Sequence, residues 1–267
     1  MPHGESWFSF LPFYESLAHW LSEAFGPSYL DHNPHLSAQF VLAYALVVFG
    51  LILVAVMVKR RLRNPEDHIL PEGKVSLYGF IETIVGATYK MSSDLMGAKP
   101  ARYFLPLIGT CALVIFFSNV LGLVPGFLPP TSNLSTTFAM AIVIFFATHI
   151  YGIKEHGFAK YFGHLFGPPV PWWIAWFIRP LVFLIELISH FVRPITLAVR
   201  LMANMTADHM VLAIFVGLFA VALNMVWLPV PVVFYILGCL VVTVQTLVFC
   251  LLSVIYIALA IQHDEEH

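Results

Sequence analysis

An arginine in the middle of an apolar segment has the clearest chemical consequence in this chain. Arg200 lies in the stretch TLAVRLMANM, residues 196–205, and the nearest acid along the chain is Asp208, eight positions later. A guanidinium stays protonated at physiological pH, and placing one at bilayer depth costs about 3 kcal/mol or more. We infer that the carboxylate that pairs with Arg200 comes from another subunit.

Polar residues recur around this arginine at the spacing of one helix face. In order, they are Glu186, Ser189, Arg193, Thr196, Arg200 and Asn204. Steps of three or four place them on one face of an α-helix, with His190, Asp208 and His209 beside it. Such a face in a membrane has to contact protein or water, and Gln245 on the last apolar segment is a candidate partner. The alternative interpretation is a set of structural ion pairs, in which Glu186 pairs with His190.

The composition indicates that these segments cross a membrane. Hydrophobic residues make up 60% of the 267-residue chain and charged residues only 10%, against about 25% charged residues in soluble domains. The mean hydropathy is +0.85. A soluble protein with so little charge could not cover its surface, so we predict a polytopic membrane protein. The three cysteines lie in apolar runs and are interpreted as reduced packing residues.

The positions of Lys and Arg predict the topology. The first 58 residues contain neither, and the first uncharged span ends in KRRLR, residues 59–63. Because basic loops stay in the cytoplasm, we predict an all-α integral membrane protein with five transmembrane helices, an outside N-terminus and a cytoplasmic C-terminus. The expected segments are an extracytoplasmic segment (1–37), a transmembrane helix (38–58), a cytoplasmic loop (59–102), a transmembrane helical hairpin (103–153), a second cytoplasmic loop (154–180), a long helical hairpin carrying the ion path (181–262) and a cytoplasmic tail (263–267).

Two segments do not match an ordinary span. Residues 76–98 mix apolar positions at helical spacing with charged ones, which predicts an amphipathic helix on the cytoplasmic surface. Residues 181–223 contain one internal proline, Pro194, and as one helix would be about 65 Å long, against a hydrocarbon core of ~30 Å. We therefore expect a long, strongly tilted helical hairpin at the C-terminus. The alternatives are a break near Pro194, or two ordinary spans that would make six in all.

Three stretches of the chain resemble subunit a of bacterial F-type ATP synthases. TLAVRLMANM is similar to the signature of that family, in which small residues flank an Arg-Leu pair and an asparagine follows it. SNVLGLVPGFLPPTSNLSTT, residues 118–137, resembles the motif of the family's third region. QTLVFCLLSVIYIALA, residues 245–260, resembles its C-terminus. The matches occur in the family's order, and the resemblance covers nearly the whole chain.

The resemblance implies a stator subunit beside a rotating ring of c subunits, with b-type peripheral stalk subunits as further partners in the bacterial inner membrane. Arg200 matches the family's essential arginine, which faces a ring carboxylate between two proton half-channels. Glu186, Ser189 and Arg193 would then belong to the inside half-channel. The outside half-channel would contain Asn119, Asn204, Asp208, His209 and Gln245.

Three positions depart from the pattern that is common in the family. Many bacterial members carry Glu where this chain has His209 and His where it has Gly238, and Asn133 replaces a common Asp. The residue that passes on protons in the outside half-channel therefore stays open at this point. His209, whose type titrates near pH 6.5, is one candidate, and the adjacent Asp208 is another. His209 could also simply fill a wet cavity.

Two other function classes fit part of the pattern. A secondary transporter or channel could use Arg200 to bind an anionic substrate, although no inverted repeat is visible. A membrane di-metal enzyme could use the histidines of HNPH, of HDEEH, and of the pair His149 and His156, but no repeated box is present. No P-loop or other nucleotide motif occurs. We therefore expect no cofactor, metal, nucleic acid or direct ATP binding, and place the ATP chemistry in partner subunits.

Overall fold

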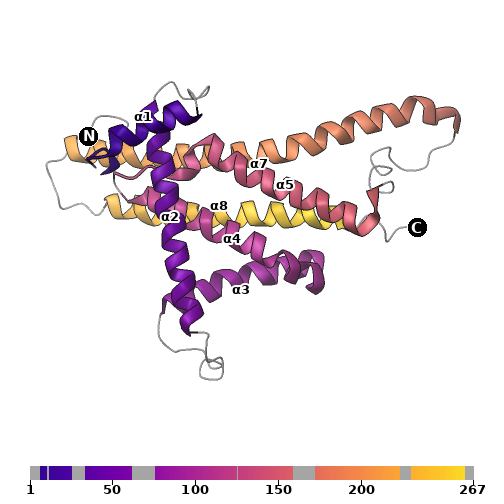
Figure 1. The fold of residues 1–267 in the computed structure, drawn as a ribbon, viewed down its shortest axis with the longest axis horizontal. Coiled ribbons are helices and arrows are strands. Elements are labelled where there is room, and N and C mark those ends of the chain that lie inside the picture. Colours follow the sequence, from indigo (N-terminus) through magenta and orange to yellow (C-terminus); the bar gives the residue numbers. More distant parts are fainter. Residues whose placement is uncertain are drawn as a thin grey trace.

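The computed structural model of the chain is a bundle of α-helices (Figure 1), and it describes residues 7–10, 12–25, 34–61, 76–124, 126–158, 172–222 and 230–261. No strand occurs in these residues. Five of the described helices are long and apolar enough to cross a membrane. They are α2 (Pro34–Arg61), α4 (Ala98–Leu123), α5 (Leu134–His156), α7 (Trp172–Ala222) and α8 (Val230–Ile261). The prediction of an all-α integral membrane protein is confirmed.

The helices α7 and α8 run antiparallel across the bundle, with α8 in its middle and α7 along its upper edge in Figure 1. The helix α5 packs mainly along α7, and α4 packs along both α3 and α8. Their shared core contains Cys111, Val114, Ile115, Met140, Ala141, Ile144, Leu197, Ala198, Leu201, Met205, Val242 and Phe249. In Figure 1, α2 runs from top to bottom whereas α7 and α8 run across the view. If α2 crosses the membrane directly, α7 and α8 are strongly tilted, as the length of this hairpin predicted.

One continuous helix passes through residue 181, where the sequence interpretation placed the start of a helix. The helix α7 has 51 residues, with Pro180 and Pro194 inside it, and is about 75 Å long. It does not break at Pro194 and does not divide into two ordinary spans. The helix begins at Trp172, so it includes the last residues of the segment 154–180 that was predicted as a cytoplasmic loop. Prolines are tolerated inside membrane helices when neighbouring groups satisfy the freed backbone atoms, so Pro180 did not mark a helix start.

The amphipathic helix is present as α3 (Leu77–Met96), which matches the expected range of residues 76–98 closely. Thr88, Ser92 and Met96 are buried one turn apart, on the side that packs against α4 and α8. The two hydroxyls donate to backbone carbonyls one turn earlier, so their burial leaves no donor unpaired. The charged residues of α3 are exposed.

The first 37 residues hold a short helix that the sequence interpretation did not include. This helix, α1 (Tyr14–Phe25), follows a turn of 3-10 helix, η1 (Trp7–Phe10), and packs against α2. The backbone N–H of Trp7 donates to the carbonyl oxygen of Gly126 at 3.1 Å. Gly126 has a φ of +92° and lies directly under the Trp7 indole, so only glycine fits there. The N-terminal segment therefore covers the loop that follows α4.

Candidate functional site

Arg200 lies on the side of α7 that faces away from the core. Leu197, Leu201 and Met205 recur every four residues and are at most 2% exposed, because they pack into the core shared with the neighbouring helices. Helical geometry then directs Arg200 outward, and the structure shows it exposed. The residues that anchor this helix are thus the ones that present the arginine to a partner or to the bilayer.

The outward side of α7 is poorly suited to lipid. In an 18-residue stretch of its spanning segment, 11% of the residues are buried, the same share as in α2. In the corresponding stretches of α4 and α8, 44% of the residues are buried. The spanning part of α2 is almost entirely apolar, but α7 exposes Thr196, Arg200 and Asn204. Because hydrocarbon cannot satisfy such groups, this face of α7 requires protein or water against it.

One turn beyond the arginine, an amide pair joins α7 to α8. Asn204 Nδ2 donates to Gln245 Oε1 at 2.8 Å, and Gln245 is 5% exposed. The structure therefore brings together these two residues, which the sequence placed on facing helices. Both side chains are neutral, so the bond sets the relative position of the helices without adding a charge that could neutralise Arg200.

A second polar group lies near the middle of α7, toward its N-terminus. His190 Nδ1 is 3.5 Å from Glu186 Oε1, and Arg193 Nη2 is 3.9 Å from the same oxygen. Arg193 also lies over the Tyr256 ring of α8, 5.7 Å from its centroid. The pairing of Glu186 with His190 that the sequence left open is present, and Arg193 reaches Glu186 across two turns. Ser189 is half-buried on the same stretch of helix.

His149 of α5 belongs to this group, although the sequence interpretation did not place it in the ion path. Its ring faces that of His190, with the centroids 5.3 Å apart and the planes at 76°. A histidine in an otherwise uncharged span indicates a possible place in the ion path, but the sequence interpretation considered His149 only as a metal ligand together with His156. Among the described residues, no three His, Cys, Asp or Glu side chains gather as metal ligands. The HDEEH sequence lies outside the described residues.

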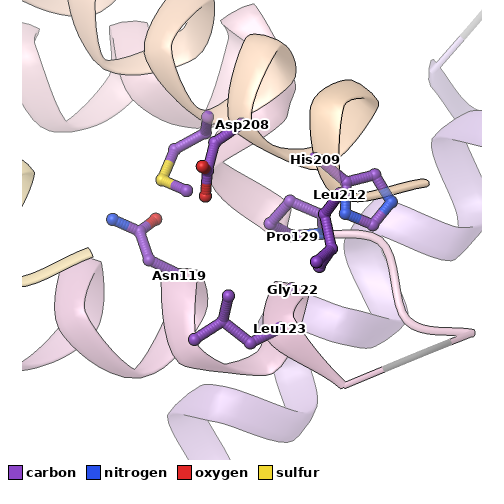
Figure 2. A pocket seen from close by; sticks show the side chains of 8 residues that line it. Asn119, Gly122, Leu123, Pro129, Asp208, His209 and Leu212 are labelled. Carbon is purple, nitrogen blue, oxygen red and sulfur yellow. The ribbon is translucent and has the colours of Figure 1, made fainter. Parts of the chain in front are cut away.

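A cavity lies at the other end of the polar face, between α4, α7 and the loop after α4 (Figure 2). Its lining consists of Asn119, Gly122, Leu123, Pro129, Met205, Asp208, His209 and Leu212. The space open to the centre of a water-sized sphere is ≈ 10 Å³, about the room that one water needs. Figure 2 shows the Asp208 carboxylate pointing into the space above Asn119. Asn119, Asp208 and His209, which the resemblance assigned to one half-channel, thus line one cavity.

The polar groups of this cavity are only partly satisfied by the chain. Thr131 Oγ1 donates to Asn119 Oδ1, whereas Asn119 Nδ2 is buried and has no hydrogen-bond partner among the described atoms. Leaving a buried donor unpaired costs about 1–3 kcal/mol. The His209 side chain and the Gly122 backbone lie on the same side of the cavity. The site therefore offers a carboxylate, an imidazole and a free amide donor beside a space for water.

Gly238 of α8 lies against the same cavity. A Cβ atom at this position would be 2.6 Å from Leu123 Cδ2 and 3.8 Å from Asp208 Oδ2. Leu123 and Asp208 therefore occupy the space that a side chain at position 238 would use. Within this structure, the acid closest to that position belongs to α7 and not to α8.

Comparisons with known proteins identify the family. The sequence profile of the ATP synthase A chain family matches residues 39–258. The chain is 41% identical over 244 residues to ATP synthase subunit a of Sorangium cellulosum (strain So ce56), which covers 91% of this chain and 90% of that protein. The chain belongs to the ATP synthase subunit a family.

Two further relatives agree with this assignment. ATP synthase subunit a 1 of Syntrophotalea carbinolica is 41% identical over 246 residues, with 91% and 95% of the two chains covered. ATP synthase subunit a of Geobacter sulfurreducens is 42% identical over 215 residues, with 80% and 86% covered. The resemblance inferred from three motifs is confirmed, and the alternative of a secondary transporter is not supported. As a member of the subunit a family, the chain is a component of an ATP synthase.

Proposed function

We propose that this subunit a is the stationary part of a proton-driven rotary motor, and that Arg200 separates two half-channels that open to opposite sides of the membrane. The observation that carries the proposal is the exposed arginine on the poorly covered helix α7. A permanent positive charge at this depth requires an anionic partner. A rotating ring of c subunits, each with one membrane-embedded carboxylate, would supply that partner repeatedly.

The packing of α7 supports two separate paths over one continuous channel. Arg193 and Asp208, which belong to the two polar groups, are 15 residues apart, or about 22 Å along the helix. Between them, Leu197 and Leu201 pack into the core and are at most 2% exposed. Closely packed apolar side chains leave no room for a chain of waters. A proton would therefore leave the subunit at one polar group and re-enter at the other, on the outward side of α7.

The chemistry of arginine fits a barrier between these two paths. A guanidinium does not release its proton, so Arg200 does not act as a relay. Its charge stabilises the ionised form of a carboxylate that comes close, which promotes loss of the proton from that carboxylate into a half-channel. The same charge repels a proton or another cation that moves directly from one half-channel to the other.

The two polar groups divide the proton path between the sides of the membrane. Glu186, Ser189 and Arg193 would line the inside half-channel. The outside half-channel would use the cavity with Asn119, Asp208 and His209, and the bonded pair Asn204 and Gln245 lies between this cavity and Arg200. Asp208 is our choice for the acid of the outside path, because its carboxylate points into the cavity (Figure 2).

Charge distribution and partners complete the proposal. The lysine- and arginine-free first 58 residues favour an outside N-terminus and a cytoplasmic C-terminus in a bacterial inner membrane. The chain contains no nucleotide-binding motif, so its role is non-catalytic and it binds no ATP or other cofactor itself. Its partners would be the c ring, the b-type peripheral stalk subunits and the lipid bilayer.

Substitution of Arg200 by alanine tests the proposal. Inverted membrane vesicles are given ATP, and acidification is followed with a pH-sensitive dye. Arg200→Ala should abolish acidification while the c ring still co-purifies with the subunit. Arg102→Ala removes another exposed arginine, at the start of α4, and should leave acidification intact. Acidification retained in Arg200→Ala vesicles would contradict the proposal.

A further inference from the structure

The N-terminal segment carries large aromatic side chains on its surface. In η1, in α1 and directly before α1, four rings are between 54% and 69% exposed: Trp7, Phe10, Phe13 and Trp20. Apolar surface gathered in this way marks contact with a partner or with a membrane. The segment precedes residue 39, where the match to the family profile begins, so membership of the subunit a family does not explain these rings.

Two sides of α1 are defined by residues that recur every four positions. Tyr14 and Ala18 are at most 5% exposed, and they form a small core with the start of α2. Glu15, His19 and Glu23 are all exposed, and their spacing places them on one side of the helix. The helix thus has one side packed against protein and another that is polar.

The aromatic rings form a third side of the same helix. The Leu17 N–H donates to the Phe13 carbonyl oxygen at 3.0 Å, so Phe13 keeps the helical register although α1 begins one residue later. Phe13 and Trp20 are seven residues apart, which is two turns, and therefore share a side. At 3.6 residues per turn, the packed, polar and aromatic sides lie roughly 120° apart. An apolar side beside a polar one is typical of a helix that lies in a membrane surface.

The contact with α2 sets the depth of α1 in the bilayer. Tyr14 and Ala18 pack with Ala38 of α2, and Leu42 lies against the same group. The membrane-spanning part of α2 also begins at Ala38. In Figure 1, α1 lies across the upper end of α2. A helix held at the first residue of a span lies where the hydrocarbon core meets the headgroups, and tryptophan is enriched at that depth.

The charge of α1 indicates which lipids it can bind. The helix contains two glutamates and neither lysine nor arginine, so anionic headgroups do not attract it. Burial of the aromatic rings has to hold it in the membrane surface, independently of headgroup charge. Residues 26–33 alone separate α1 from α2, and this short connection keeps the rings beside the bilayer at a high effective concentration.

We propose that α1 is an interfacial helix in the outer leaflet of the membrane. Phe13 and Trp20 enter the region between headgroups and acyl chains, about 5–10 Å deep, while the side with Glu15 and Glu23 faces water. The ligand is phospholipid of any headgroup charge. The inference rests on the orientation given in the proposed function, because the N-terminus has to lie outside.

The anchored segment also contacts the wall of the cavity that contains Asp208. Besides the bond from Trp7 to Gly126, the Phe8 ring lies edge to face with the Phe127 ring, with centroids 5.3 Å apart and planes at 75°. Pro129 of the same loop lines the cavity. An interfacial α1 therefore holds this loop at a fixed depth in the membrane.

The test measures the surroundings of single positions on the aromatic and polar sides of α1. One cysteine at a time replaces Phe13, Trp20, Glu15 or Glu23 in the complete ATP synthase, with Cys239→Ser as the background because the other two cysteines are buried. Each cysteine receives a nitroxide spin label, and the complex is reconstituted into phosphatidylcholine vesicles with or without phosphatidylglycerol. The collision rates of the label with O2, which concentrates in bilayers, and with a water-soluble nickel chelate are then compared.

We expect the ratio of O2 to chelate collisions to be severalfold higher at positions 13 and 20 than at positions 15 and 23. The difference should persist in both lipid mixtures and at high salt, because it does not depend on charge. The structure exposes all four side chains, so positions 15 and 23 are matched controls on the same helix. Each aromatic variant keeps the other ring, so either one tests the inference if the other does not assemble.

Two results would overturn the inference. Equal ratios at all four positions would place α1 in water, and low collision rates with both reagents at positions 13 and 20 would show that protein covers the rings. The orientation is tested separately in inverted membrane vesicles, where chelate in the lumen, but not outside, should reach the label at position 15. The reverse would remove both the outer-leaflet assignment and the proposed orientation, whereas acidification by Arg200→Ala vesicles tests the proposed motor independently of α1.

Discussion

Substitution of Gly238 by alanine would place a methyl group where the structure has almost no room. The new Cβ would lie 2.6 Å from Leu123 Cδ2, about 1 Å closer than carbon atoms pack at their optimal separation. The atom that must move is the end of a flexible leucine side chain, so the cost should be about 1 kcal/mol, at the low end for overpacking. Leu123 lines the cavity that contains Asp208 and Asn119, and we expect it to turn into that space.

The substitution should reduce proton pumping much more than it reduces the stability of the complex. The displaced methyl group of Leu123 would fill much of the cavity, in which the space open to the centre of a water-sized sphere is ≈ 10 Å³. Water should then no longer fit between Asp208 and Asn119. We expect ATP-driven acidification by Gly238→Ala vesicles to fall severalfold, with a melting temperature of the complex within a few degrees of the wild type. Gly79→Ala in α3, where nothing lies within 4 Å of the new Cβ, is the matched control.

A second substitution shows whether the contact itself is responsible. Leu123→Ala removes the atoms that the new Cβ would meet, so Gly238→Ala combined with Leu123→Ala should recover acidification relative to Gly238→Ala alone. Such a coupling between two residues in contact is measured as the difference between the double variant and the sum of the single ones. Full activity of Gly238→Ala, or absence of coupling to Leu123→Ala, would refute this account of the cavity.

Two further substitutions address the remaining polar contacts. Asp208→Asn keeps the shape of the side chain but removes its acid, so proton pumping should fall and its pH dependence should change; unchanged pumping with an unchanged pH profile would exclude Asp208 as the acid of the outside path. Gln245→Leu removes the hydrogen bond from the exposed Asn204 amide, which should cost about 0.5–1.5 kcal/mol and lower the thermal stability of the complex. The double variant Asn204→Leu and Gln245→Leu should recover part of that loss, and a double variant that is less stable than Gln245→Leu alone would argue against the bond.

The polar face of α7 could be predicted because it depends on one helix only. Steps of three and four between residues 186 and 204 follow from the period of an α-helix, and no tertiary contact is needed to recognise them. The length of the same helix could be predicted less accurately. Pro180 reads as a helix boundary in soluble proteins, whereas in the structure α7 passes through it and begins at Trp172.

Contacts between helices explain what the sequence interpretation missed. His149 and His190 are 41 positions apart, and nothing in either segment indicates that the two faces meet. The short helix α1 was missed because its segment is not long enough to cross a membrane. The close approach of Leu123 to Gly238 also depends on how α4 and α8 pack, and a glycine in a helix does not reveal which neighbour excludes a side chain there.

The sequence by itself determined the membrane class, the apolar spans and the single polar face that carries Arg200, because composition, span length and helical period are local properties of the chain. Tertiary structure alone decided contacts that no sequence pattern indicated: His149 with His190, and Leu123 with Gly238. Those pairs depend on how far each helix is rotated and shifted against its neighbour. Packing of side chains between helices sets that rotation, and the period of one helix contains no information about it.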